Sequence, residues 1–310
     1  MKKERLSLLL LTLISLTLVS CNSNNNNNSS SEDVVGDPVY FIPEDEDLDT
    51  TVSANDVQYD VSNVEEIPGS YLKDKKIYWL GSSVTYGASS EGQSMADFIA
   101  KRSGCTSVKE AVSGTTLLND GLTQNTGAKS YVNRLITSTA FDKEEEIDAF
   151  VCQISTNDCT NDRLNKRGRI TPDDYIELDD FNVATSLGAV EYIIAYVMET
   201  WGCPVYFYSG SYFSDGSNKA QRQNNNPLGS EYAKFIGQVQ QIADKWDNYY
   251  DYHVQVIDLY NDEDFNDLAS DKYYNWAIND PIHPRKAGYS QWWSPYIQNF
   301  LEKDLYELNK

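Results

Sequence analysis

The chain has 310 residues and carries 25 Lys and Arg against 47 Asp and Glu, which gives a formal net charge of −22 at pH 7. Such an acidic surface repels nucleic-acid phosphates and anionic lipid headgroups, so we expect no nucleic-acid partner. A neutral substrate is easier for this protein to accept. The length suggests one or two domains.

Residues 1–21 have the pattern of a bacterial export signal. The basic start MKKER precedes an apolar run that is shorter than the ~20 residues of a membrane-spanning helix. The run ends at LVSC, which resembles the lipobox of bacterial lipoproteins, where cleavage leaves a lipid-bearing cysteine. We therefore expect a lipoprotein signal peptide with lipobox Cys21, export to the cell surface or periplasm, and a membrane anchor through the lipid on Cys21. The alternative is an ordinary secretory signal with a chance cysteine.

Residues 22–70 are predicted to be a tether followed by an acidic extension. The tract NSNNNNNSSS cannot bury apolar surface and is expected to stay solvated. Further on, VYFIP (39–43) and VQYDV (57–61) are candidate short strands lying against the main body. Residues 71–310 are assigned to one domain.

From residue 75 onward, apolar runs alternate with amphipathic stretches. Strands are predicted at 75–81, 107–113, 147–155, 203–210 and 253–260. Helices are predicted at 94–104, 185–202, 231–246 and over the C-terminal region from residue 286, where Pro295 is a candidate interruption. This alternation predicts an α/β fold, a three-layer α/β/α sandwich around a mostly parallel five-stranded sheet.

Polar clusters follow three of these strands, at the edge where ligands gather in parallel sheets. They are Ser82 and Ser83 in GSSVTYG, Ser113 and Gly114 in SGTT, and Asn157 in STND, while DPIHP (280–284) precedes the last helix. Gly- and Ser-rich stretches also form ordinary turns. Turn formation alone does not explain why four clusters share one edge.

Acyl transfer chemistry would use these residue types. A serine hydroxyl needs a base, and histidine is the usual one because its pKa lies near neutrality. His253 begins a predicted strand, so it should lie at the opposite edge in a structural or solvent-exposed role. His283 follows Asp280 by three residues, close enough for the carboxylate to hold the imidazole Nδ1–H. A local turn or capping arrangement is the alternative for this pair.

A developing oxyanion also needs hydrogen-bond donors. The backbone N–H groups of Ser83 and Gly114 and the side-chain amide of Asn157 are the candidates, and one such donor typically contributes ~2.7–4 kcal/mol to the transition state. Asn157 also fits an Asx turn or a helix cap.

Taken together, these blocks resemble the SGNH hydrolases, also called the GDSL family. That family has a serine in a Gly-Asp-Ser-Leu-like block after strand one, a glycine after strand two, an asparagine in a Gly-x-Asn-Asp block after strand three, and a C-terminal Asp-x-x-His block. The matching stretches here are GSSVT, AVSGTT, STND and DPIHP, and the resemblance covers about residues 75–303.

The resemblance implies a flavodoxin-like SGNH hydrolase fold and a site of five residues. It assigns Ser83 as nucleophile, His283 as base and Asp280 as its orienting carboxylate, with Ser83, Gly114 and Asn157 forming the oxyanion hole. This sequence departs from the family pattern at Ser82, where Asp is usual, and at Ser155, where Gly is usual. We expect an active enzyme in which Ser82 and Thr85 help to hold the loop.

A serine esterase without cofactor or metal is therefore expected. Export, a tether and many aromatic residues (22 Tyr, 10 Phe and 6 Trp) favour carbohydrate as the substrate class, with removal of O-acetyl groups by a monomer. The alternatives are hydrolysis of lipid or small esters, acyl transfer to a sugar, and a catalytically inactive glycan-binding lipoprotein.

The cysteines and one acidic run do not change the predicted chemistry. Cys105, Cys152, Cys159 and Cys203 match no zinc pattern, and their disulfide pairing stays open. The acidic run NDEDFND (261–267) lacks the ligand spacing of an EF-hand and is expected to be a solvated loop.

Overall fold

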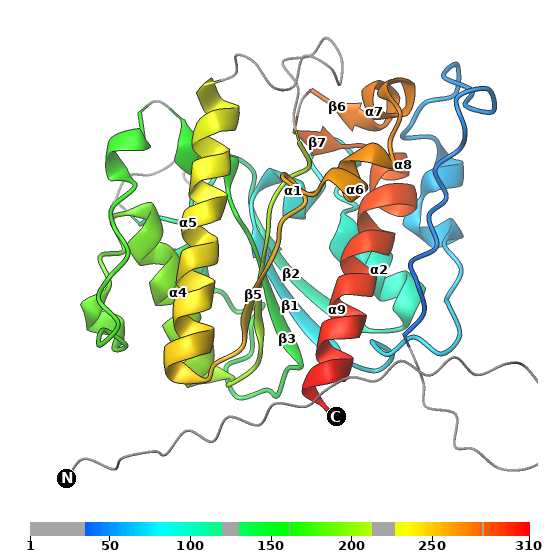
Figure 1. Cartoon of the computed structure of the whole chain (residues 1–310). Coiled ribbons are helices and arrows are strands. Elements are labelled where there is room, and N and C mark those ends of the chain that lie inside the picture. Colours follow the sequence, from blue (N-terminus) through cyan, green and yellow to red (C-terminus); the bar gives the residue numbers. More distant parts are fainter. Residues whose placement is uncertain (1–34, 120–129, 161, 213–226, 281) are drawn as a thin grey trace, which may run out of the picture. The chain divides into compact units, whose positions relative to one another are not determined.

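Four short apolar runs and one more polar edge strand, β2, form one parallel sheet with the strand order β2-β1-β3-β4-β5 (Figure 1). This is the order of flavodoxin-like folds. All five predicted strands are present, with ends shifted by a few residues, so the predicted fold class is confirmed. The strands are β1 (Lys76–Gly81), β2 (Thr106–Ala111), β3 (Ala149–Gln153), β4 (Val205–Tyr208) and β5 (Val254–Ile257).

The computed structural model describes residues 35–119, 130–160, 162–212, 227–280 and 282–310. The predicted signal peptide, Cys21 and the Asn/Ser tract lie outside the described residues. Residues from Val35 to Lys310 pack as one unit. Within the described ranges, no helix combines the length and the apolar character needed to cross a membrane.

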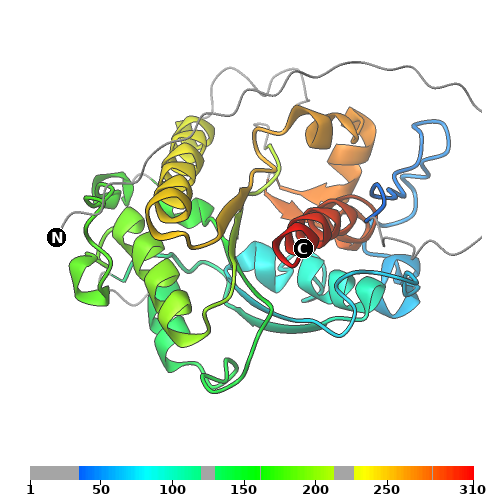
Figure 2. The ribbon, with the colours of Figure 1, turned by 60° about the horizontal axis from the view of Figure 1, so that its bottom comes forward.

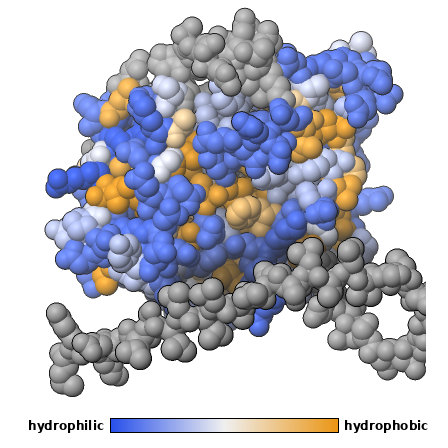
Figure 3. Space-filling model, viewed as in Figure 1, coloured by the Kyte–Doolittle hydropathy of each residue, from blue (hydrophilic) through white to orange (hydrophobic). Residues whose placement is uncertain are grey.

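Alternate side chains of the strands build two cores, one on each face of the sheet. On β1, Tyr78 and Leu80 belong to one core, whereas Ile77 and Trp79 belong to the other. The first core is covered by α3 (Tyr131–Thr137), α4 (Ser186–Thr200) and α5 (Pro227–Tyr250), and the second by α2 (Met95–Ser103), α7 (Asp271–Ala277) and α9 (Ser294–Leu308) (Figures 1 and 2). Hydrophilic residues dominate the face seen in Figure 3, in keeping with the high net charge.

Local signals set the bounds of helix α2 as predicted. Ser94 and Asp97 form a reciprocal capping box at its start. Gly104 ends the helix with a φ of 76°, in the left-handed region that glycine adopts without strain.

The C-terminal helical region is distorted near Pro295 but not broken. Helix α8 (Lys286–Gly288) continues through a π-helical turn (Tyr289–Trp293) into α9. Pro295 has no N–H for the carbonyl of Gln291, four residues earlier, and that carbonyl accepts a bond from the N–H of Phe41 at 3.2 Å. The expected interruption is therefore the π-helical turn, and the carbonyl of Gln291 binds the N-terminal extension through Phe41.

Two predictions about acidic segments are wrong. VYFIP and VQYDV form no strands, and two 3-10 turns, Val57–Tyr59 and Val61–Asn63, begin within the second stretch. Asp56 and Asp60 begin these turns by accepting backbone N–H bonds, the local bonding typical of aspartate. The run 261–267 is no solvated loop either, because Asp262 caps helix α6 (Glu263–Asp267) by accepting from the N–H of Phe265.

Candidate active site

The serine turn follows strand β1 directly. Ser83 begins the single helical turn α1 (Ser83–Tyr86), two residues after the strand ends at Gly81. A Cβ at position 81 would lie 1.6 Å from Thr85 Oγ1, so only glycine permits this close approach. Gly87 ends α1 with a φ of 85° and donates its N–H to the carbonyl of Ser83 at 3.0 Å.

Gln153, the last residue of β3, holds this turn from behind. Its Oε1 accepts hydrogen bonds from Ser82 N at 3.0 Å, Thr85 N at 3.1 Å and Thr85 Oγ1 at 2.8 Å. Thr85 Oγ1 also lies 2.6 Å from the Tyr208 hydroxyl. Thr85 thus holds the loop as expected. Ser82 contributes its N–H, whereas its buried Oγ makes no hydrogen bond within the described part of the chain.

The structure brings Ser83, His283 and Asp280 together from opposite ends of the domain. Ser83 Oγ lies 2.7 Å from His283 Nε2. His283 Nδ1 lies 3.0 Å from Asp280 Oδ1 and 2.9 Å from Asp280 Oδ2. The serine hydroxyl, imidazole and carboxylate therefore form one continuous hydrogen-bonded chain.

A small antiparallel ribbon presents the histidine and the aspartate. It consists of β6 (Ile278–Asn279) and β7 (His283–Pro284). Asp280 has a φ of 43°, a left-handed conformation that aspartate tolerates, and its Oδ1 accepts the N–H groups of Ile282 and His283 at 2.9 and 3.2 Å. Arg285 fixes the base of the ribbon by donating to the carbonyl of Ile278 at 2.9 Å.

Gly114 and Asn157 lie on the loops that flank the serine turn, because β2 and β3 are the two neighbours of β1. Gly114 has a φ of 77°, which explains the glycine. Among the described residues, the N–H groups of Ser83 and Gly114 donate to no protein acceptor. Asn157 Nδ2 donates to the carbonyl of Thr115 at 2.9 Å, which uses one of its two amide hydrogens.

Arg134 is a positioning residue that the sequence did not indicate. It lies on α3, a helix absent from the predicted elements, and is buried. Its Nη2 donates to the carbonyl of Gly81 at 2.8 Å and to Thr115 Oγ1 at 3.0 Å. One guanidinium therefore joins the end of β1 to the loop of Gly114.

Ser155, a departure from the family pattern, fits its position. Its φ of −78° requires no glycine. Its Oγ accepts from Asn157 N at 3.1 Å and donates to the carbonyl of Thr115 at 3.2 Å. Ser155 and Asn157 thus fasten the loop after β3 to the loop after β2.

Asp158 is fully buried and pins the next part of the same loop. It accepts from Leu117 N at 2.9 Å, Leu118 N at 3.4 Å and Ser186 Oγ at 2.9 Å. Burial raises the pKa of Asp158 to about 6 despite these bonds.

His253 lies away from this edge, at the start of β5, in the structural role expected of it. Its Nε2 lies 2.6 Å from Asp304 Oδ2, which also accepts from the Tyr206 hydroxyl at 2.6 Å. Burial opposes ionisation of Asp304, but the bonds from His253 and Tyr206 outweigh it and lower its pKa.

The four described cysteines are free and buried, and no disulfide joins them. Burial raises the pKa of Cys159 and of Cys203 to about 12, so these thiols stay neutral. Over the described ranges, no three His, Cys, Asp or Glu side chains are arranged to hold a metal ion.

Comparison with known proteins relates the chain to others by fold. No protein-family model and no curated protein matches the sequence. One solved structure is 20% identical, with a TM-score of 0.51, over 74% of this chain and 97% of that chain. A protein from Lactobacillus plantarum is 18% identical (TM-score 0.49, 74% of this chain and 97% of that one), and a carbohydrate acetylesterase family member from Sinorhizobium meliloti is 14% identical (TM-score 0.45, 73% and 99%). The first of these similarities shows a shared fold.

Proposed function

We propose that this protein is a serine esterase of the SGNH type, with Ser83 as its nucleophile. The observation that carries the proposal is the 2.7 Å contact between Ser83 Oγ and His283 Nε2, with Asp280 on the other imidazole nitrogen. A nucleophile, a base and a group that orients the base are the three parts of an activated serine. They stand at the carboxyl end of β1, where ligands bind in such sheets.

In the first step, the Ser83 hydroxyl attacks the ester carbonyl and passes its proton to His283 Nε2. Asp280 holds Nδ1–H and stabilises the imidazolium that forms. The carbonyl oxygen becomes negatively charged, and the N–H groups of Ser83 and Gly114 and the second amide hydrogen of Asn157 are the donors for it. His283 then gives its proton to the departing alcohol, which leaves an acyl group on Ser83.

In the second step, His283 takes a proton from water, and the water oxygen attacks the acyl carbonyl. The acid leaves and the proton returns to Ser83 Oγ. Every bond in this cycle is formed by ester, water and the side chains named, so the reaction needs no further reagent.

The proposed substrate is a carbohydrate that carries O-acetyl groups. Tyr86 supports this proposal, because this aromatic residue of α1 is 47% exposed and lies one helical turn from Ser83, and sugars stack on aromatic faces. The net charge of −22 also favours a neutral substrate. The proposed place of action is outside the cytoplasm, on a membrane to which the lipid on Cys21 holds the protein.

The test is ester hydrolysis by the purified protein beside Ser83→Ala. We expect wild type to cleave p-nitrophenyl acetate faster than the butyrate and octanoate esters, and to release acetate from acetylated xylan. Ser83→Ala should fall to background. Thr139→Ala, at an exposed position just after α3, is the control variant and should keep wild-type rates. A preference for octanoate would refute the acetyl substrate, and an active Ser83→Ala would refute the serine mechanism.

A further inference from the structure

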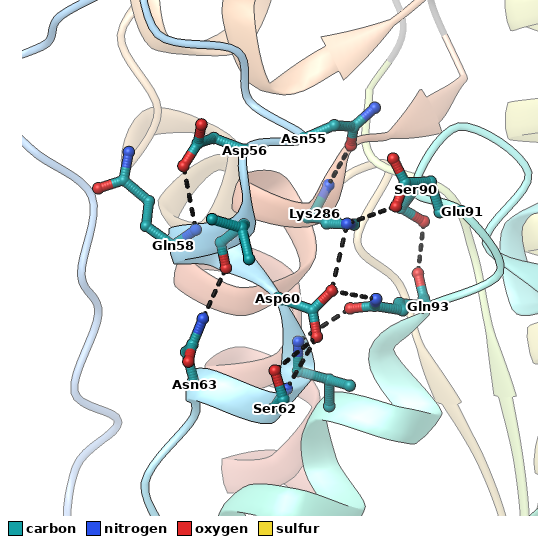
Figure 4. A network of polar contacts seen from close by, with 12 residues as sticks. Asn55, Asp56, Gln58, Asp60, Ser62, Asn63, Ser90, Glu91, Gln93 and Lys286 are labelled. Carbon is teal, nitrogen blue, oxygen red and sulfur yellow. Dashed lines mark hydrogen bonds and ion pairs between the residues drawn. The ribbon is translucent and has the colours of Figure 1, made fainter.

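Part of the N-terminal extension crosses the seam between the two segments that carry the proposed catalytic pair. We call residues 52–63 the strap. The serine loop, residues 87–93, follows α1, and the histidine segment, residues 279–287, contains His283. Figure 4 shows Glu91 and Gln93 of the serine loop and Lys286 of the histidine segment beside the strap. The strap forms hydrogen bonds with both segments, although more than 200 residues separate it from the histidine segment.

Lys286 stands at the centre of these contacts. It is only 3% exposed and lies three residues after His283. Its Nζ lies 2.6 Å from Glu91 Oε2 in the serine loop and 3.2 Å from Asp60 Oδ2 in the strap (Figure 4). A buried ammonium group is costly unless it is paired, so its position ties the three segments to one another.

Asn55 makes a second bridge, and this one is neutral. Its Oδ1 accepts from the backbone N–H of Lys286 at 2.9 Å. Its Nδ2 donates to the carbonyl of Ser89 in the serine loop at 2.8 Å. Beside it, the carbonyl of Ala54 accepts from the N–H of Ala287 at 2.9 Å. One strap side chain therefore bonds the backbone of both segments.

Gln93 locks the strap to the end of the serine loop. Its Oε1 accepts from Val61 N at 2.8 Å, and its Nε2 donates to Asp60 Oδ2 at 2.6 Å (Figure 4). Hydrogen bonds from Gln93, and then from Ser62, hold the pKa of Asp60 well below its usual range. Asp60 therefore remains a carboxylate, the partner that Lys286 requires.

We infer that Asn55 and Asp60 are positioning residues for catalysis, and that the strap fixes the spacing of Ser83 and His283. The inference rests on the proposed function. The two catalytic groups lie on a one-turn helix and on a ribbon of two two-residue strands, which offer little rigidity of their own. A displacement of ~1 Å at a reacting group can cost ~10²-fold in rate. The boundary predicted at residue 71 would leave the strap outside the enzyme, whereas these contacts make it part of the active-site framework.

The test compares Asn55→Ala and Asp60→Asn with Asp56→Asn, all in the full chain. Asp56 caps the other 3-10 turn of the strap through Gln58 N and bonds neither the serine loop nor the histidine segment, so it is a matched control (Figure 4). The readouts are kcat and KM on p-nitrophenyl acetate, the melting temperature, and backbone hydrogen exchange in the serine loop and histidine segment.

We expect Asn55→Ala and Asp60→Asn to lower kcat about 10-fold or more at nearly constant KM, with faster exchange in both segments at temperatures where the protein stays folded. Asp60→Glu should recover part of the lost rate, and Asp56→Asn should resemble wild type. Equal kcat in Asp60→Asn and Asp56→Asn, or unchanged exchange, would overturn the inference. A wild type without esterase activity would refute the proposed function. The exchange data would then still test whether the strap holds the serine loop and the histidine segment in place.

Discussion

Gln153→Met removes the acceptor behind the serine turn while keeping nearly the same side-chain volume. Gln153 is 2% exposed, and its Oε1 accepts from Ser82 N, Thr85 N and Thr85 Oγ1. After the substitution, Thr85 Oγ1 keeps the Tyr208 hydroxyl as a partner at 2.6 Å. The two backbone N–H groups lose the only acceptor they have among the described residues.

An unsatisfied buried donor costs about 1–3 kcal/mol, so two of them should lower the free energy of unfolding by about 2–6 kcal/mol. Part of this loss is avoided if the turn moves to find other acceptors, but such a movement displaces Ser83 from His283. We therefore expect either a large loss of stability or a smaller one accompanied by a fall of kcat of about 10²-fold.

Urea unfolding followed by tryptophan fluorescence gives the stability, and p-nitrophenyl acetate hydrolysis gives kcat. Gln240→Met is the matched control, because Gln240 lies on α5 and, among the described residues, its side chain bonds only Asp244 at the surface. Loss of under about 1 kcal/mol in Gln153→Met, together with wild-type kcat, would show that Gln153 does not hold the serine turn.

Three further predictions concern the orienting carboxylate, a buried acid and the anchor. Asp280→Asn should lower kcat about 10³–10⁴-fold at nearly constant KM, because the amide no longer holds His283 Nδ1–H or stabilises the imidazolium; wild-type kcat would exclude that role. Burial raises the pKa of Asp158 to about 6, so the folded state binds this proton more tightly than the unfolded state. Its contribution to stability should fall by roughly 2 kcal/mol as pH rises from 4 to 6, and the wild-type stability measured relative to Asp158→Asn by urea unfolding at each pH should show this fall; a constant difference would refute it. Cys21→Ala expressed in a bacterial host should move the protein from the membrane fraction to the soluble fraction, and an unchanged distribution would refute the lipid anchor.

Much of the framework is readable from the sequence because its signals are local. Four of the five strands, all except β2, are apolar runs that contain β-branched or aromatic residues, and GSSVTYG, SGTT and STND lie at or next to strand ends. Asp280 and His283 are only three residues apart, so their contact follows from the chain itself. Gly81 and Gly114 mark positions where a close approach or a positive φ excludes other residues.

The residues that hold the framework together escaped prediction because their partners are distant. In the sequence, Gln153 is only a polar residue at the end of a predicted strand, and Arg134 is a charged residue in a segment for which no helix was predicted. Only the fold brings both side chains next to the serine turn. The sequence of the acidic extension predicts a solvated segment because it is rich in carboxylates and has few periodic apolar positions. Asp60 is ordered there by Lys286, which lies more than 200 residues further along the chain.

Detection of an acyl group on Ser83 tests the central claim most directly. The full-length protein would be mixed with p-nitrophenyl acetate, quenched in acid within the first turnovers, digested and measured by peptide mass spectrometry. The mechanism predicts acetylation of the peptide that contains Ser83 in wild type, and its loss together with turnover in Ser83→Ala. Sustained turnover by Ser83→Ala, or a wild type that neither turns over nor becomes acetylated, would contradict the account.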